Sequence, residues 1–247
     1  MELTQGDNSS KKENKYEAKQ EERKRTAAAL QKKKTLKRVS FWTFVILLLG
    51  GGVYGIIKLG DASPSSQAAF LVAPVSSQDL VMGSSTSRVV LIEYSDFQCP
   101  ACGAYYPLVK QITSEYQGRI QFVYRNFPLP QHKNAKLAIA AAYAADKQGR
   151  FWEMHDALFE HQPSWAESNN AEALFITYAG DLHLNVTQFT SDLHSPEIQQ
   201  RVDSDYEQAV KAGINSTPSF FLDGARIQPQ NYDAFKSAID KELAAHA

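Results

Sequence analysis

Two cysteines, Cys99 and Cys102, are the only ones in a chain of 247 residues, and just two residues separate them. A small secreted fold held by disulfides needs several bridges between distant segments, and a structural zinc site needs four ligands. Neither class fits a single pair of neighbouring thiols. Residues 88–94 form a β-branched apolar run typical of a buried strand, and a helix is predicted from the pair to about residue 116. The pair therefore lies where a strand leads into a helix.

The rest of the pattern predicts an α/β domain with a helical lobe inserted into its sheet. A second strand at 119–125 completes a parallel β-α-β unit. From about residue 134 to 212 the pattern is helical, with helices predicted at 135–145, 151–159, 171–179 and 195–212. Strands return at 219–222 and 225–227 around Asp223 and Gly224, a pair that indicates a hairpin, and a helix at about 232–245 ends the domain.

The residues before this domain are expected to anchor it in a membrane. Residues 1–38 hold 12 basic and 6 acidic side chains and predict a solvated tail. Residues 39–57 are almost wholly apolar and would span roughly 28 Å as a helix, which matches the hydrocarbon core of a bilayer and predicts an anchor at 39–58. Because basic clusters stay on the cytoplasmic side, we expect a cytoplasmic tail, a single span, a linker at 59–78 and an extracytoplasmic domain at 79–247.

Both features of this region have an alternative interpretation. The apolar run resembles a cleaved signal peptide in composition, but the segment before it is unusually long and no clear Ala-x-Ala site follows it. The basic cluster could bind nucleic acid, but its position beside the apolar run favours a topology signal. We therefore expect a retained anchor and no nucleic-acid partner.

The position of the cysteines indicates thiol-disulfide exchange. This chemistry needs a thiolate, and a helix N-terminus lowers the pKa of a cysteine placed there. Cys99 takes that place, and Pro100 suits the first helical turn because its missing N–H is not needed there. Cys102, one turn along, can resolve a mixed disulfide formed at Cys99. We therefore expect Cys99 to be the exposed nucleophile and Cys102 the more buried resolving thiol. A permanent structural bridge is disfavoured, because closing so short a loop removes little chain entropy.

Four segments in this order carry a family resemblance: EYSDFQCPACG at 93–103, YRNFPL at 124–129, QGRFWEMHD at 148–156 and STPSFF at 216–221. Together they resemble the DsbA family of disulfide-bond oxidoreductases, in particular its membrane-anchored, Gram-positive-type branch. The resemblance covers residues 80–245 and implies a thioredoxin-like fold with an inserted helical lobe. It also implies that the disulfide between Cys99 and Cys102 is the redox group, with no bound cofactor. The six histidines show no metal-ligand spacing, so no metal is predicted.

The resemblance implies roles for three further residues. Pro218 matches the cis-proline that faces the disulfide, and Thr217 precedes it; the alternative is an ordinary trans turn. Ser216 stands where the family often has a glycine, so the loop geometry can differ. Glu93 matches a buried acid near the second cysteine, where a desolvated carboxyl group could carry the proton of Cys102. The alternative for Glu93 is an exposed acid on a sheet edge.

Three functions follow from these features. The first is an oxidase that donates its disulfide to exported proteins with free thiols and is reoxidised by a membrane quinone-linked partner. The second is a reductase or isomerase supplied with electrons from the cytoplasm, and the third is a folding factor that binds extended peptides without turnover. Isomerases of this superfamily usually add a dimerisation domain, and no segment is left over for one. We therefore expect an oxidase at a bacterial cell membrane.

Overall fold

The computed structural model describes residues 72–84 and 86–246. The predicted tail at 1–38, the predicted span at 39–58 and most of the predicted linker lie outside these residues. Among the helices of the described part, none is long and apolar enough to cross a membrane.

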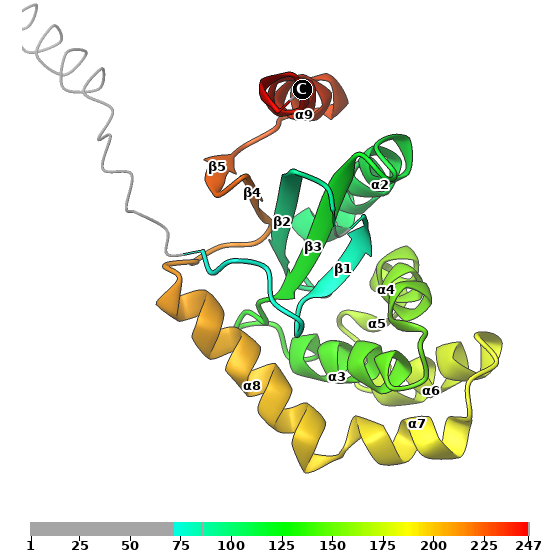
Figure 1. Ribbon diagram of the computed structural model, residues 1–247. Coiled ribbons are helices and arrows are strands. Elements are labelled where there is room, and N and C mark those ends of the chain that lie inside the picture. The colour runs from blue at the N-terminus through cyan, green and yellow to red at the C-terminus, as the bar shows by residue number, and fades with distance from the viewer. Residues whose placement is uncertain (1–71, 85, 247) are drawn as a thin grey trace, which may run out of the picture. The chain divides into compact units, whose positions relative to one another are not determined.

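A five-stranded mixed sheet, with strand order β1-β3-β2-β4-β5, forms the centre of the domain (Figure 1). Its two middle strands are β2 (Val89–Ser95) and β3 (Ile120–Asn126), which run parallel to each other. The helix α2 (Pro100–Glu115) connects them. This is the predicted β-α-β unit, and each strand begins one residue later than predicted.

The edges of the sheet are antiparallel. β1 (Leu80–Gly83) pairs with β3, and its four residues were too few to show a pattern in the sequence. On the other side, β4 (Ser219–Leu222) pairs with β2, and β5 (Ala225–Ile227) pairs with β4. The turn between them has φ values of 47° at Asp223 and 80° at Gly224. Two positive φ values are typical of a tight hairpin turn, so the hairpin prediction is confirmed.

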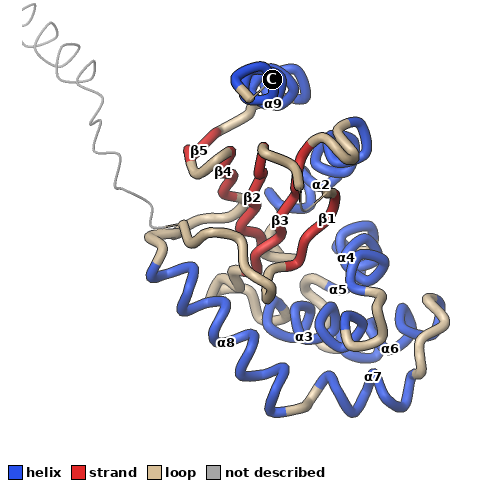
Figure 2. The backbone as a smooth tube through the Cα atoms, viewed as in Figure 1, coloured by secondary structure: helices blue, strands red, loops and turns tan. Residues whose placement is uncertain are grey.

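The chain between β3 and β4 contains helices and loops and is called the inserted lobe below (Figure 2). Its helices are α3 (Ala135–Asp146), α4 (Phe151–Glu160), α5 (Gln162–Trp165), α6 (Ala171–Asp181), α7 (Val186–Leu193) and α8 (Pro196–Lys211). Helices α5 and α7 are absent from the helices predicted from the sequence. The start of α7 carries a signal that could have identified it, because the Asn185 side chain accepts a hydrogen bond from the backbone N–H of Gln188.

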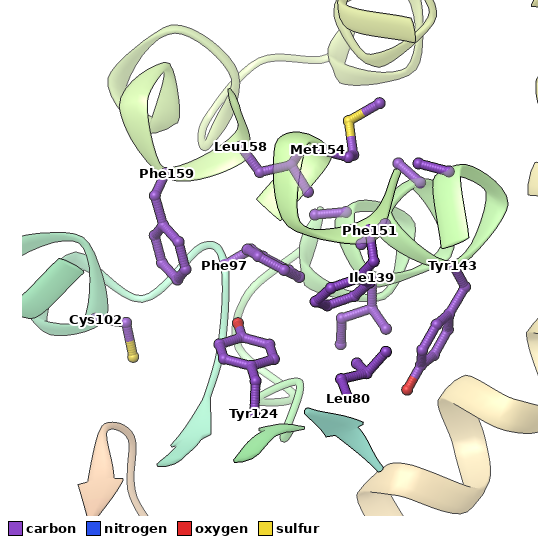
Figure 3. Close-up of a cluster of buried hydrophobic side chains, with 14 of the residues drawn as sticks. Leu80, Phe97, Cys102, Tyr124, Ile139, Tyr143, Phe151, Met154, Leu158 and Phe159 are labelled. Carbon is purple, nitrogen blue, oxygen red and sulfur yellow. The ribbon is translucent and has the colours of Figure 1, made fainter. Parts of the chain in front are cut away.

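Alternating side chains of β2 enter two separate cores. Leu91 belongs to the larger core, which the sheet forms with α2, most of the inserted lobe and α9 (Tyr232–Ala245). Ile92 belongs to the smaller core, which includes Ala209 of α8. Glu93 follows the alternation of Leu91, so its carboxyl group is directed to the side of the larger core. Cys102 of α2 belongs to the same core (Figure 3).

Residues 72–78 form no helix or strand, but they pack against the domain. Val72 and Val75 contact the smaller core. The Arg125 guanidinium donates to the carbonyl oxygen of Pro74 at 3.2 Å and to both carboxylate oxygens of Asp79 at 2.7 and 3.0 Å. The packed domain therefore begins before residue 79, where the sequence analysis ended the linker.

Candidate active site

The two cysteines lie in the first turn of α2, directly after the loop that follows β2. Cys99 is the N-cap residue, with extended backbone at φ −67° and ψ 121°, and Pro100 is the first helical residue. The Cys99 side chain is therefore close to the N–H groups that have no partner within the helix. Both cysteines are free thiols.

The surroundings of Cys99 favour its thiolate. The largest contribution is a hydrogen bond from the thiol of Cys102; burial opposes it, and the Thr217 side chain and the backbone N–H groups of Cys102 and Ala101 add to it. Together they lower the pKa of Cys99 to about 5. Within residues 72–84 and 86–246 the buried Thr217 hydroxyl has no other hydrogen-bond partner, so it is available to the sulfur.

The two thiols differ in their burial and in their acidity. Cys102 is 1% exposed, and burial, the adjoining Cys99 sulfur and the charge of Glu93 raise its pKa well above the ordinary value. Cys99 is more accessible than Cys102, but its exposed fraction is only 7%. The expectation of an exposed Cys99 is therefore wrong, because the loop at Thr217 lies over the sulfur.

That loop contains the predicted cis-proline. The peptide bond between Thr217 and Pro218 is cis, and the Cys99 Sγ lies 3.6 Å from the carbonyl oxygen of Thr217. The Ser219 hydroxyl donates to the carbonyl oxygen of Ser216 at 2.8 Å, which closes the loop before β4. Ser216 therefore fits this cis geometry without the glycine that the family resemblance implies.

Glu93 is buried in the middle of the sheet. It is 4% exposed and lies between Tyr124 on β3 and Phe220 on β4, so the alternative of an exposed edge acid is wrong. Burial raises the pKa of Glu93 to about 7, and the Ser95 hydroxyl opposes part of this change. Because Glu93 also contributes to the raised pKa of Cys102, the two groups influence each other's protonation.

A cavity of about 290 Å³ next to Glu93 lies between α2, α4 and the strands β1 and β3. Its polar lining includes Lys110, His155 and Asp156. The Asp156 carboxylate is 2.9 Å from Lys110 Nζ and 3.0 Å from His155 Nδ1. The Lys110 side chain is half exposed, so these groups connect the cavity to the surface.

The residues that hold the loop between β2 and α2 were not predicted from the sequence. The carboxylate of Asp96, which is 0% exposed, accepts hydrogen bonds from the backbone N–H groups of Gln98 and Leu129, both at 2.8 Å. Its Oδ2 is also 2.7 Å from His132 Nδ1. The bond to Gln98 is a local turn motif that the sequence could have indicated, whereas the other partners lie more than thirty residues away.

One group of possible metal ligands lies among the described residues. Ligand atoms of Asp223, Glu242 and His246 are within 4.8 Å of one another, at the end of β4 opposite to Pro218. The Asp223 carboxylate already accepts a hydrogen bond from the Val90 backbone N–H at 2.7 Å and contacts His246 at 3.3 Å. These contacts explain the grouping without an ion.

A family model described as thioredoxin matches residues 76–241. The Bacillus anthracis protein named "Probable disulfide bond formation protein D" is 31% identical over 212 residues, which cover 83% of this chain and 94% of that protein. The Salinispora tropica Na⁺/H⁺ antiporter NhaA 3 is 34% identical over 178 residues, which cover 71% of this chain and 26% of the antiporter. This chain thus spans about a quarter of the length of the antiporters that it matches.

Solved structures show the same fold. BdbD from Bacillus subtilis, in its oxidised form, superposes with a TM-score of 0.61 and 25% identity over 67% of this chain and 93% of that one. Wolbachia pipientis alpha-DsbA1 superposes with a TM-score of 0.64 and 21% identity over 71% of this chain and 95% of that one. The predicted thioredoxin-like fold is therefore confirmed.

The first prediction from this geometry concerns the acidity of Cys99. The alkylation rate of Cys99, measured against pH by mass spectrometry, should show a midpoint near 5, far below the ordinary value of about 8.5. Because the Cys102 thiol is the main donor, Cys102→Ala should raise this midpoint. A wild-type midpoint at or above the ordinary value would contradict the arrangement described here.

The second prediction concerns the stability of the reduced protein. Glu93 has a folded-state pKa of about 7 against an ordinary 4.5, so the native state binds more protons between these values. The contribution of Glu93 to stability should therefore fall by roughly 3 kcal/mol as pH rises through this window, while the low pKa of Cys99 contributes in the opposite direction above pH 5 in both wild type and the Glu93 variant. Glu93→Gln should remove this fall, as seen by urea unfolding at pH 4 and pH 8. Glu207→Gln, an exposed change on α8, is the control, and parallel profiles for Glu93→Gln and wild type would refute the prediction.

Proposed function

Because the chain belongs to the thioredoxin family and is a DsbA-like thiol-disulfide oxidoreductase, we propose that it acts as an oxidase that introduces disulfides into exported proteins. The observation that carries this proposal is the placement of Cys99 at the start of α2, with donors that favour its thiolate. A stabilised thiolate favours the reduced pair, and a pair whose reduced form is favoured is a strong oxidant.

The reaction follows from the difference between the two thiols. A client thiolate attacks Cys99 Sγ, the bond between Cys99 and Cys102 breaks, and its electron pair goes to the Cys102 sulfur. A second client thiolate then attacks the client sulfur of the mixed disulfide and displaces Cys99 as a thiolate. The client gains one disulfide, and the pair gains two electrons. The low pKa of Cys99 makes it a good leaving group in the second step.

Glu93 supplies the proton in the first step. The Cys102 thiolate is unfavourable because its sulfur is buried, so it takes a proton as it leaves. The protonated carboxyl group of Glu93, with a pKa of about 7, donates that proton within the larger core. The cavity lined by Lys110 and Asp156 then returns a proton from solvent to Glu93.

The loop with the cis-proline holds the client. Its backbone at Thr217 lies beside Cys99, where an extended client segment can pair with main-chain groups and bring its cysteine to the sulfur. Pro218 itself has no N–H, so the pairing uses the backbone of Thr217. Selection among clients then depends on side chains around this loop rather than on a deep pocket.

The cellular setting belongs to the same proposal. We place the domain outside the cytoplasm of a bacterium, held by a retained anchor at 39–58 with the basic tail inside. Exported proteins with free thiols are its substrates there. A membrane quinone-linked protein accepts the two electrons and restores the disulfide. A stabilised thiolate makes the reduced pair a poor electron donor, which disfavours a reductase, and a binding factor would not need one.

The oxidase cycle can be tested by trapping its intermediate. In Cys102→Ala, Cys99 can still attack a disulfide of a client or of the reoxidising partner, but nothing resolves the product. Mixed disulfides through Cys99 should therefore accumulate on non-reducing gels of intact cells. Cys99→Ala is the matched control and should trap almost none. Equal trapping by both variants would refute the division into attacking and resolving thiols, and no trapping by either would favour the binding factor.

The topology can be tested with protease. Protease added to intact cells without a wall should digest the domain and spare the tail of residues 1–38, because the basic cluster retains the tail inside. An epitope tag at each end of the chain shows in one experiment whether the tail and the domain are digested. A digested tail with a protected domain would contradict the proposed orientation.

A further inference from the structure

A glutamine of the inserted lobe contacts the redox motif, residues 99–102, and the loop that leads into it. Gln162, the first residue of α5, donates from its side-chain Nε2 to the carbonyl oxygen of Phe97 at 2.6 Å and to that of Cys99 at 2.9 Å. An amide group has two N–H donors, so both are used on the loop that enters α2. Within the described residues, no other side chain bonds the main chain on both sides of Gln98 in this way.

The position of Gln162 is fixed by its own neighbours. One turn later in α5, Trp165 is 0% exposed and donates from its indole N–H to the Leu158 carbonyl oxygen at 2.8 Å. His161 directly precedes Gln162, and its ring stacks on the ring of Tyr178 with centroids 5.0 Å apart. The amide therefore reaches the motif from a rigid support and loses little conformational freedom when it binds there.

The first turn of α2 leaves room for this amide because residue 103 is a glycine. A Cβ atom at Gly103 would lie 2.3 Å from Oε1 and 3.1 Å from Nε2 of Gln162. No ordinary contact is that short, so any side chain at residue 103 would push the amide away from the carbonyl groups. Gly103 and Gln162 thus depend on each other.

We propose that Gln162 is a positioning residue through which the inserted lobe tunes the redox equilibrium of the cysteine pair. The proposal deepens the oxidase function and rests on it, because it concerns the same two thiols. The Cys99 carbonyl also accepts the helical bond from the Gly103 N–H at 3.1 Å. By holding the carbonyl groups of Phe97 and Cys99, the amide keeps the chain entering α2 at the angle that sets the sulfur at the helix N-terminus.

A second contact makes the lobe and this loop one unit. The Gln98 side chain donates to the Ala166 carbonyl oxygen at 2.6 Å and accepts from the Asn134 backbone N–H at 2.6 Å. Gln98 fixes the loop to the lobe, and Gln162 acts on the motif itself. Loss of the Gln162 amide should weaken the reduced form most, because only that form carries a thiolate that depends on the position of the helix.

The test replaces Gln162 with its isosteric acid. Gln162→Glu removes both donors and sets a negative charge beside the two carbonyl groups. In a glutathione redox buffer, the equilibrium of the pair should shift about tenfold toward the disulfide, which corresponds to ~30 mV for a two-electron couple. The alkylation midpoint of Cys99 should rise by about one pH unit. Gln148→Glu is the matched control, because that amide bonds Asn185 within the lobe and should leave both values unchanged.

A second pair of variants tests the mechanism independently. Gly103→Ala should displace the amide and shift the equilibrium in the same direction as Gln162→Ala. The double variant should shift it no further than Gln162→Ala alone, because both changes remove the same two bonds. Additive shifts of the redox equilibrium would show that residue 103 acts independently of the Gln162 amide, and they would overturn the coupling between Gly103 and Gln162.

The outcomes separate this proposal from the oxidase function. If Gln162→Glu and Gly103→Ala fold and leave the equilibrium and the Cys99 midpoint unchanged, Gln162 is only structural and the proposal is overturned. A wild-type pair as reducing as thioredoxin would overturn the oxidase function, while a shift between wild type and variants would still support positioning by Gln162. If Gln162→Glu does not fold, the redox equilibrium and the Cys99 midpoint of Gly103→Ala alone decide whether the proposal holds.

Discussion

The stabilisation of one thiolate at the start of α2 is the interaction on which the site depends. Cys99 obtains it from the Cys102 thiol and from N–H groups of the first helical turn. Other parts of the fold maintain that position: β2 delivers the chain to the helix, and Asp96 closes the loop between them. The cis-proline loop covers the sulfur with the Thr217 backbone. The sheet, the loops and the inserted lobe thus all help to hold the start of α2, where the Cys99 sulfur lies.

Burial acts in the same direction on the three ionisable groups around that sulfur, but the outcome differs between them. It raises the pKa of Cys102 and of Glu93, and the donors around Cys99 overcome it there. The result is a pair in which one sulfur is ionised and the other holds its proton at neutral pH, with a carboxyl group able to exchange a proton beside it. A carboxyl group in an apolar core costs stability, and this cost is consistent with a functional rather than a structural purpose for Glu93.

The sequence predicted the features that depend on local pattern. The β-α-β unit, the hairpin at Asp223 and Gly224 and the helical nature of the lobe follow from periodicity and turn chemistry, and the cis-proline follows from family resemblance. Contacts between distant segments were not predictable in this way. Gln162 bonds Phe97 across 65 positions and His132 meets Asp96 across 36, and no local pattern specifies such a meeting. The low exposure of Cys99 was missed for the same reason, because the covering loop lies more than a hundred residues away.

The reduction potential of the wild-type pair tests this account most directly. It measures the difference in free energy between the disulfide and the two thiols, and a stabilised Cys99 thiolate raises it. Equilibration of the purified protein with glutathione should give a value well above about −270 mV, the potential of thioredoxin. A value at or below that of thioredoxin would contradict the account, because the environment of Cys99 would then not favour the reduced form.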